Sequence, residues 1–98
     1  MNVGLYRLTP AAQRDLSSIW DYTLERWDAD QAETYVLKMR SAIERIADQP
    51  DRGRAVDEIR KGYRRYAIGS HLIFFVESDD GVDIIRILHR RMDPTRHL

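Results

Sequence analysis

The sequence of 98 residues contains no cysteine, only three prolines and no long apolar segment. Without cysteine there can be no disulfide framework and no metal site built on thiolates. The longest uninterrupted apolar run, Leu72–Val76, is far too short to span a bilayer. The first ten residues lack the basic region followed by an apolar stretch that is typical of a secretory signal. We therefore expect the protein in the cytoplasm and away from membranes.

An excess of charge of either sign is also lacking, because 16 Lys and Arg residues balance 16 Asp and Glu residues. A net charge of zero does not indicate a general nucleic-acid-binding protein. The basic residues are nevertheless concentrated in three places, Arg52/Arg54, Arg60–Arg65 and Arg86–Arg96. The sequence therefore allows a local basic patch and excludes a uniformly basic protein.

The composition is that of a globular protein, with 43% hydrophobic and 33% charged residues. A chain of this length can build one modest hydrophobic core and is too short for two. We therefore predict a single domain over residues 1–98.

Two helices are predicted in the first half of the chain. Thr9 is a suitable N-cap, and Pro10 suits the first helical position because its missing N–H would be unpaired there. Apolar residues then recur at steps of three and four as far as Trp27. A second helix begins after Asp28, which resembles the start of a capping box, and Pro50 ends it. Because the connection is so short, the two helices are expected to form an antiparallel hairpin.

Strands are predicted on both sides of the helical hairpin. The segment Val3–Leu8 alternates in part and is interpreted as an edge strand. Residues 51–62 are interpreted as a loop. Residues 63–93 contain a short strand and then two apolar strands that fold back around residues 78–81. The predicted fold class is α+β, with an N-terminal strand, a two-helix hairpin, a three-stranded antiparallel sheet and a short C-terminal tail.

The last two strands can pair in two registers. A three-residue loop, Asp79–Gly81, would end in a left-handed glycine and would pair His71 with His89 and Phe75 with Ile85. A two-residue loop, Asp80–Gly81, would shift the pairing of the two strands by one residue. We favour the longer loop. Both registers leave apolar residues on both faces, so these strands are expected to be central in the sheet, with helices on at least one side.

The histidines are the residues best suited to acid–base chemistry, because imidazole titrates near neutral pH. In the favoured register His71 and His89 are cross-strand neighbours, and Arg90 and Arg91 follow. Such a group could cleave RNA, with histidine moving protons and arginine stabilising the charged phosphorane. An inert pair of hydrogen-bonded histidines is the simpler interpretation, and we prefer it. No third ligand is spaced to complete a metal site, and no cofactor is expected.

Arg86 lies between Ile84 and Leu88 on an otherwise apolar strand face, so its guanidinium requires a partner. An ion pair with Asp15 or Glu58 is favoured over contact with a substrate.

The chain also carries several aromatic residues on its predicted helices, namely Trp20, Tyr22, Trp27 and Tyr35. Most are expected in the core or between the helices. One helical hairpin in so small a protein cannot bury all of them, and any that stay exposed would form a protein-binding surface.

The ordered pattern of segments resembles the ParE branch of the RelE/ParE toxins of bacterial type II toxin–antitoxin modules. No single segment is specific to this family, but the full set of segments in this order along the chain is. The matching segments are Tyr6–Ala12, Asp15–Leu16, Ile19–Thr23, Pro50, Gly53–Arg54, Glu58–Arg60, Gly62–Arg64, His71–Phe75 and Ile87–Asp93. The resemblance implies a toxin that inhibits DNA gyrase by protein–protein contact. It also implies neutralisation by a ParD-like ribbon-helix-helix antitoxin, through which the complex would contact DNA.

The resemblance further implies two binding surfaces in a hetero-oligomer with the antitoxin. Apolar anchors of the antitoxin are expected in the groove of the helical hairpin. The residues expected to contact it are Leu16, Trp20, Trp27, Tyr35 and Met39. The residues expected to contact gyrase are Arg64, Arg86, His89, Arg90, Arg91 and Met92. No catalytic centre is expected on this hypothesis.

Two alternatives remain open. RelE-like relatives are ribosome-dependent mRNA nucleases, and an enzyme of this type would use His71, His89 and Arg90. Only His89 matches their catalytic set, because His71 stands where some of them keep a strand arginine, and Arg90 stands where they have tyrosine. Acid, base and phosphate clamp must act together, so this hypothesis ranks second. The third is a non-toxic module that binds the antitoxin as a corepressor.

Overall fold

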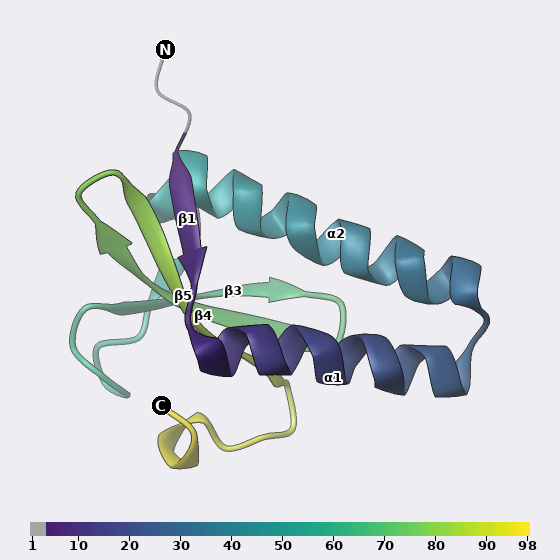
Figure 1. Cartoon of the computed structure of the whole chain (residues 1–98). Helices are drawn as coiled ribbons and strands as arrows, with labels where there is room; N and C mark the ends of the chain where they lie inside the picture. Colours follow the sequence, from purple (N-terminus) through teal and green to yellow (C-terminus); the bar gives the residue numbers. More distant parts are fainter. Residues whose placement is uncertain (1–3) are drawn as a thin grey trace.

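The computed structural model describes residues 4–98, so Val3, with which the first strand was expected to begin, lies outside the described residues. Figure 1 shows the helical hairpin packed against a twisted sheet. The elements in chain order are β1 (Leu5–Leu8), α1 (Pro10–Arg26), α2 (Ala29–Asp48), the 3-10 turn η1 (Pro50–Arg52), β2 (Arg54–Ala55), β3 (Tyr63–Ile68), β4 (His71–Ser78), β5 (Gly81–His89) and the 3-10 turn η2 (Pro94–Arg96).

The sheet corrects the predicted three-stranded antiparallel arrangement. It has five strands in the order β1-β5-β4-β3-β2. β1 is an edge strand as predicted, but it pairs in parallel with β5, placing Leu5 opposite Gly81. β2 lies within the predicted loop and pairs antiparallel with β3. A two-residue strand is too short to show alternation, and a pairing between distant segments leaves no local pattern.

The helices begin and end where the sequence places them, to within one residue. The side chain of Thr9 caps α1 by accepting a hydrogen bond of 3.0 Å from the amide of Ala12. The carboxylate of Asp28 caps α2 in the same way, at 2.8 Å from the amide of Gln31. Each cap satisfies an amide that has no partner within its helix. α1 and α2 form the predicted antiparallel hairpin (Figure 1).

The hairpin of β4 and β5 follows the favoured register over only half of its length. His71 lies opposite His89, as predicted. The pairing shifts next to Phe75, which lies opposite Ile84 and not opposite Ile85. Ile85 is therefore the extra residue of a β-bulge, which an alternating pattern of apolar residues cannot reveal.

The turn of this hairpin matches neither predicted loop, because Asp79 and Asp80 form it alone. Gly81 is a strand residue and is not among the glycines with positive φ. A Cβ atom on Gly81 would lie 1.6 Å from the carbonyl oxygen of Leu5. The glycine is therefore required for the close approach of β1 and not for a left-handed turn.

The sheet has a core on each face. The larger core lies between the sheet and both helices and comprises Ala12, Ile19, Met39, Ala42, Ile43, Ile46, Ala47, Ile73, Phe75, Val82, Ile84 and Ile87. The smaller core on the other face comprises Val56, Phe74 and Leu88, with Ile59, Tyr63, Leu72 and Leu98 packed against it. Helices thus cover one face, and the segment around β2 with the C-terminal residues covers the other. Within residues 4–98, no helix is both long and apolar enough to cross a membrane.

Candidate functional site

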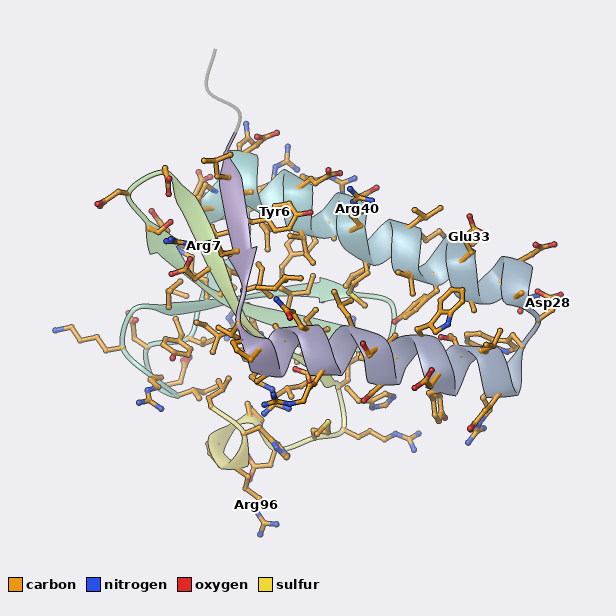
Figure 2. All side chains as sticks on the ribbon, in the orientation of Figure 1. Tyr6, Arg7, Asp28, Glu33, Arg40 and Arg96 are labelled. Carbon is orange, nitrogen blue, oxygen red and sulfur yellow. The ribbon has the colours of Figure 1, made fainter. Side chains whose placement is uncertain are left out.

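The tip of the helical hairpin extends past the end of the sheet (Figure 1), and Asp28 lies at this tip (Figure 2). Between the tip and the ends of β4 and β5 is a cavity of about 410 Å³, which we call the histidine cavity. Three segments supply its walls: Ile19, Tyr22, Thr23, Arg26 and Trp27 from α1 and its C-cap, Tyr35 from α2, and Ser70, His71 and His89 from the sheet.

Tyr35 connects α2 to the histidines. Its hydroxyl lies 2.6 Å from Nδ1 of His71 and accepts a hydrogen bond of 3.1 Å from the amide of Ser70. The rings of His71 and His89 meet edge to face, with centroids 5.4 Å apart. The predicted cross-strand pair of histidines is therefore present, and an aromatic hydroxyl holds one of its members.

Burial keeps His71 neutral at neutral pH. Loss of solvent is the main cause that lowers the pKa of His71 to about 4, and the electrostatic influence of nearby His89 lowers it further. The carboxylate of Asp15 acts in the opposite direction. Burial also raises the pKa of the Tyr35 hydroxyl, which therefore keeps its proton. We assign this single proton to the short contact with Nδ1 of His71, because the other acceptor within reach, the carbonyl of Ile68, lies farther away at 3.4 Å.

His89 is held by the turn that follows β5. Its Nδ1 accepts a hydrogen bond of 3.1 Å from the amide of Arg91. Nδ1 of each histidine thus accepts a hydrogen bond, which places the ring N–H on Nε2. Both residues line the histidine cavity.

Arg86, which was expected to need a partner, forms the predicted ion pair with Asp15 and not with Glu58. Its Nε and Nη2 atoms donate to the two carboxylate oxygens at 2.8 and 2.9 Å. Asp15 also accepts from the amide of Ile87 at 2.9 Å, which ties α1 to β5. Arg86 further donates to the carbonyl of His97 at 3.2 Å and so anchors the C-terminal segment.

The six residues expected to contact gyrase do not share one surface. Arg64 lies on β3 opposite Phe75, where it donates to the carbonyl of Gly53 at 2.7 Å and pairs with Glu77 at 3.3 Å. Arg86 is mostly buried in its ion pair. Four consecutive residues, His89–Met92, lie at the end of β5 and in the turn that follows it, and we call them the basic turn.

The side chains of the basic turn are not all free. Arg90 donates from Nε to the carbonyl of Gly69 at 2.9 Å. Met92 is 37% exposed, and Arg91 is exposed as well. Because Arg90 is bonded to the backbone, Arg91 and Met92 are the side chains of the basic turn best placed to reach a partner.

The residues expected to contact the antitoxin also divide into two groups. Met39 is fully buried in the larger core, which corrects its assignment to a binding surface. Leu16 packs against the same core, and Trp20 is half-buried. Trp27 and Tyr35 line the histidine cavity, and Trp27 is 52% exposed. Met39 was grouped with the expected antitoxin contacts by its helical spacing. Residues that face the core share this spacing, so it could not distinguish a core residue from one that lines a binding groove.

Sequence reasoning missed other exposed apolar side chains on the helices. Leu24 and Leu37 are each more than 40% exposed. They lie outside the face whose spacing was followed, and only the packed structure shows which of them stay uncovered. Within the described residues, no three His, Asp or Glu side chains are grouped to hold a metal ion.

Comparison with known proteins identifies the relatives of this chain. A family model described as "ParE toxin of type II toxin-antitoxin system, parDE" matches residues 6–94. The chain is 50% identical over 94 residues to Toxin ParE1 of Mycobacterium tuberculosis, covering 95% of this chain and 96% of the relative. It is 42% identical over 93 residues to Toxin ParE1 of Caulobacter vibrioides, again covering 95% and 96%.

Solved structures share the fold. A chain from the chromosomal ParDE toxin–antitoxin system of P. aeruginosa superposes with a TM-score of 0.76 at 17% identity, covering 89% of this chain and 96% of that one. A conserved hypothetical protein from Helicobacter pylori gives a TM-score of 0.57 at 18% identity, covering 89% and 94%. The near-complete match to the family model and the full-length relatives lead to one conclusion: this chain belongs to the ParE toxin family of type II toxin–antitoxin systems.

Proposed function

We propose that this chain is a toxin that inhibits DNA gyrase by protein–protein contact and that a ParD-like antitoxin neutralises it. The observation that carries the proposal is the match to the ParE family over residues 6–94, together with 50% identity to a named ParE toxin. The described residues supply one candidate surface for each partner.

The basic turn is the candidate surface for gyrase. It projects from the end of β5, and Arg91 and Met92 are exposed there. An exposed arginine beside an apolar side chain is a common composition for a contact that dominates a protein interface. Arg64 and Arg86 take part in structural bonds, so we assign them to the fold and not to this surface.

The helical hairpin is the candidate surface for the antitoxin. Exposed Tyr22 and Trp27 stand beside the histidine cavity, and a second cavity of about 290 Å³ shares Trp27 and Tyr35 with it. Aromatic side chains at adjoining cavities suit the apolar anchors of an extended or helical peptide.

A supercoiling assay with purified gyrase tests the toxin activity. The protein is expected to block supercoiling and to trap gyrase on broken DNA. Arg91→Ala is expected to weaken inhibition about tenfold, as is usual for an exposed hot-spot residue. Arg40→Ala on the exposed side of α2 is the matched control and should inhibit fully. Normal supercoiling and intact DNA in the presence of excess protein would contradict the proposal.

A growth test separates this function from that of a non-toxic corepressor. Expression without an antitoxin should stop DNA synthesis and growth, and co-expression of a small ribbon-helix-helix protein encoded beside it should restore both. Growth that is unaffected by expression alone would favour the corepressor.

The His71–His89 pair favours one second candidate, a ribosome-dependent mRNA nuclease. Two features weigh against it: His71 is neutral at neutral pH, and Arg90 is bonded to backbone. A nuclease should produce new message ends that primer extension detects and that disappear in His89→Ala. If translation continues while replication stops, this candidate is excluded.

A further inference from the structure

We infer that the histidine cavity is a carboxylate-binding pocket that takes an acidic residue within an apolar segment of a peptide partner. The inference rests on the proposed function in one respect, because it takes this peptide to belong to the antitoxin. Three properties of the cavity carry it: its hydrogen-bond donors, its charge and its walls.

The donors come from the two histidines. Tyr35 occupies Nδ1 of His71, and the amide of Arg91 occupies Nδ1 of His89. Within residues 4–98, no protein group bonds Nε2 of either ring. Because Nδ1 accepts in both rings, each Nε2 carries an N–H, and two such donors suit a carboxylate oxygen and do not suit an ammonium group.

The charge comes from Arg26, in the last turn of α1. Its guanidinium stacks 4.8 Å above the ring of Tyr22, at the wall of the cavity. No carboxylate among the described residues lies within ion-pair distance of it. The carboxylate that acts most on His71 is that of Asp15, and Arg86 already neutralises it. Among the residues that line the histidine cavity, Arg26 is thus the one Lys, Arg, Asp or Glu side chain.

The cavity walls between the histidines and Arg26 are either apolar or already hydrogen-bonded within the protein. Ile19, Tyr22 and Trp27 supply apolar surface, and the hydroxyl of Thr23 is used by the carbonyl of Ile19. Hydrogen bonds to a charged group gain strength when apolar walls exclude water. A cavity of about 410 Å³ accommodates a glutamate side chain with part of an apolar neighbour.

The neighbouring cavity indicates a peptide and not a small molecule. It continues from Trp27 and Tyr35 along α2 to Thr34 and Lys38. Asp28 and Asp30 also line it, so it repels a second carboxylate and limits the anionic site to the histidine cavity. An extended ligand with one acidic position fits this pair of cavities.

Nuclear magnetic resonance titration of the intact chain tests the inference with two matched peptides. Acetyl-Phe-Glu-Leu-amide and acetyl-Phe-Gln-Leu-amide differ only in the carboxylate. The glutamate peptide is expected to bind about tenfold more tightly, as charge-assisted hydrogen bonds imply, and to shift the Nε2 signals of His71 and His89. Arg26→Gln should remove most of this preference. Arg14→Gln, the same change elsewhere on α1, should leave it unchanged.

Three results would overturn the inference: equal affinity for the two peptides, shifts that avoid both histidines, or phenylacetate binding as tightly as the glutamate peptide. The last result would assign the pocket to a small carboxylic acid. Because the titration contains no gyrase, its outcome is independent of the supercoiling assay, and failure of one does not imply failure of the other.

Discussion

The two ends of the β4–β5 hairpin each adjoin a surface cavity of about 410 Å³, yet their walls differ completely. At the turn end the walls are glycine, backbone and carboxylates, including those of Asp48, Asp79 and Asp80. At the open end they are aromatic rings, two imidazoles and a guanidinium. The two cavities therefore cannot be distinguished by their size, but they can be distinguished by the chemistry of the residues that line them.

The difference follows from what each end must do for the fold. The turn end holds β1 against β5 at backbone distance, so Gly4 and Gly81 stand there at positions where a Cβ would collide with a backbone carbonyl. At the open end α1 and α2 run past the sheet, so large side chains bridge the space without filling it. Four sets of variants test this contrast.

The largest effect is expected for Gly81→Ala at the turn end. The new Cβ would lie 1.6 Å from the carbonyl oxygen of Leu5, so β1 must move and its pairing with β5 weakens. The expected loss is about 3 kcal/mol or more in the free energy of unfolding, measured by urea denaturation.

The matched change at the open end is Gly69→Ala. Its Cβ would meet the ring of Tyr35 at 2.7 Å, and its φ of +55° adds strain. A ring can shift where a backbone cannot, so we expect a loss of about 1–2 kcal/mol. A larger loss of stability for Gly69→Ala than for Gly81→Ala would contradict the view that the turn end is the more tightly packed of the two.

Two ion pairs provide the second test, one at the middle of the hairpin and one nearer its turn end. Asp15→Asn leaves the mostly buried Arg86 without a carboxylate at the middle of the hairpin, where the side chains of Asp15 and Arg86 are only 13% and 22% exposed. The expected loss is about 2–3 kcal/mol. Asp83→Asn removes the pair with Arg7 at the turn end, whose side chain is 73% exposed, and should cost less than about 0.5 kcal/mol. Equal losses in thermal unfolding would contradict the assignment of Asp15 as the anchor of α1.

Tyr35→Phe removes the hydroxyl that holds the open end together. The variant loses the bond to Nδ1 of His71 and leaves the amide of Ser70 without this partner. We expect a loss of about 1 kcal/mol in stability. Because the hydroxyl donates to neutral His71, its removal should also raise the pKa of His71, measured by titration of the histidine resonances. An unchanged pKa would show that burial alone keeps His71 neutral.

The last test at the open end is the pH dependence that His71 contributes. Its pKa in the folded protein, about 4, lies below the ordinary value of 6.5, so the unfolded chain binds the proton more tightly. The stabilising contribution is complete above pH 6.5 and is lost as the pH falls to 4. Allowing for solvent screening, it amounts to about 1 kcal/mol. His71→Gln should remove this part of the slope, and His97→Gln should keep it. Identical slopes for His71→Gln and the wild-type protein would refute the assignment.

Local patterns were sufficient to predict the helices and part of the site. Thr9 and Asp28 cap the two helices because capping depends on residues three positions away. The His71–His89 pair was also correctly predicted, although the loop from which it was derived was wrong, because the turn is one residue shorter and the extra residue of the bulge, Ile85, restores the register beyond it. The shift after Phe75 was not predicted, since a bulge leaves the apolar pattern unchanged.

Features that depend on distant segments were missed or misassigned. The parallel pairing of β1 with β5 joins opposite ends of the chain, so Gly81 was taken for a turn residue. Met39 shares its helical spacing with groove residues and nevertheless lies fully inside the core. Arg64 was grouped with the basic turn by residue type, although the sheet separates it from His89.

By itself, the sequence determined the class of fold, the caps and length of both helices, and membership of the ParE family, because these depend on local spacing and on the order of segments. Only the tertiary structure decided which face the helices cover, which arginines bond to the protein itself, and that Arg26, His71 and His89 line one cavity. The reason is physical: burial and unoccupied donors arise from packing between residues far apart in the chain, and no local pattern encodes which side chains that packing leaves free.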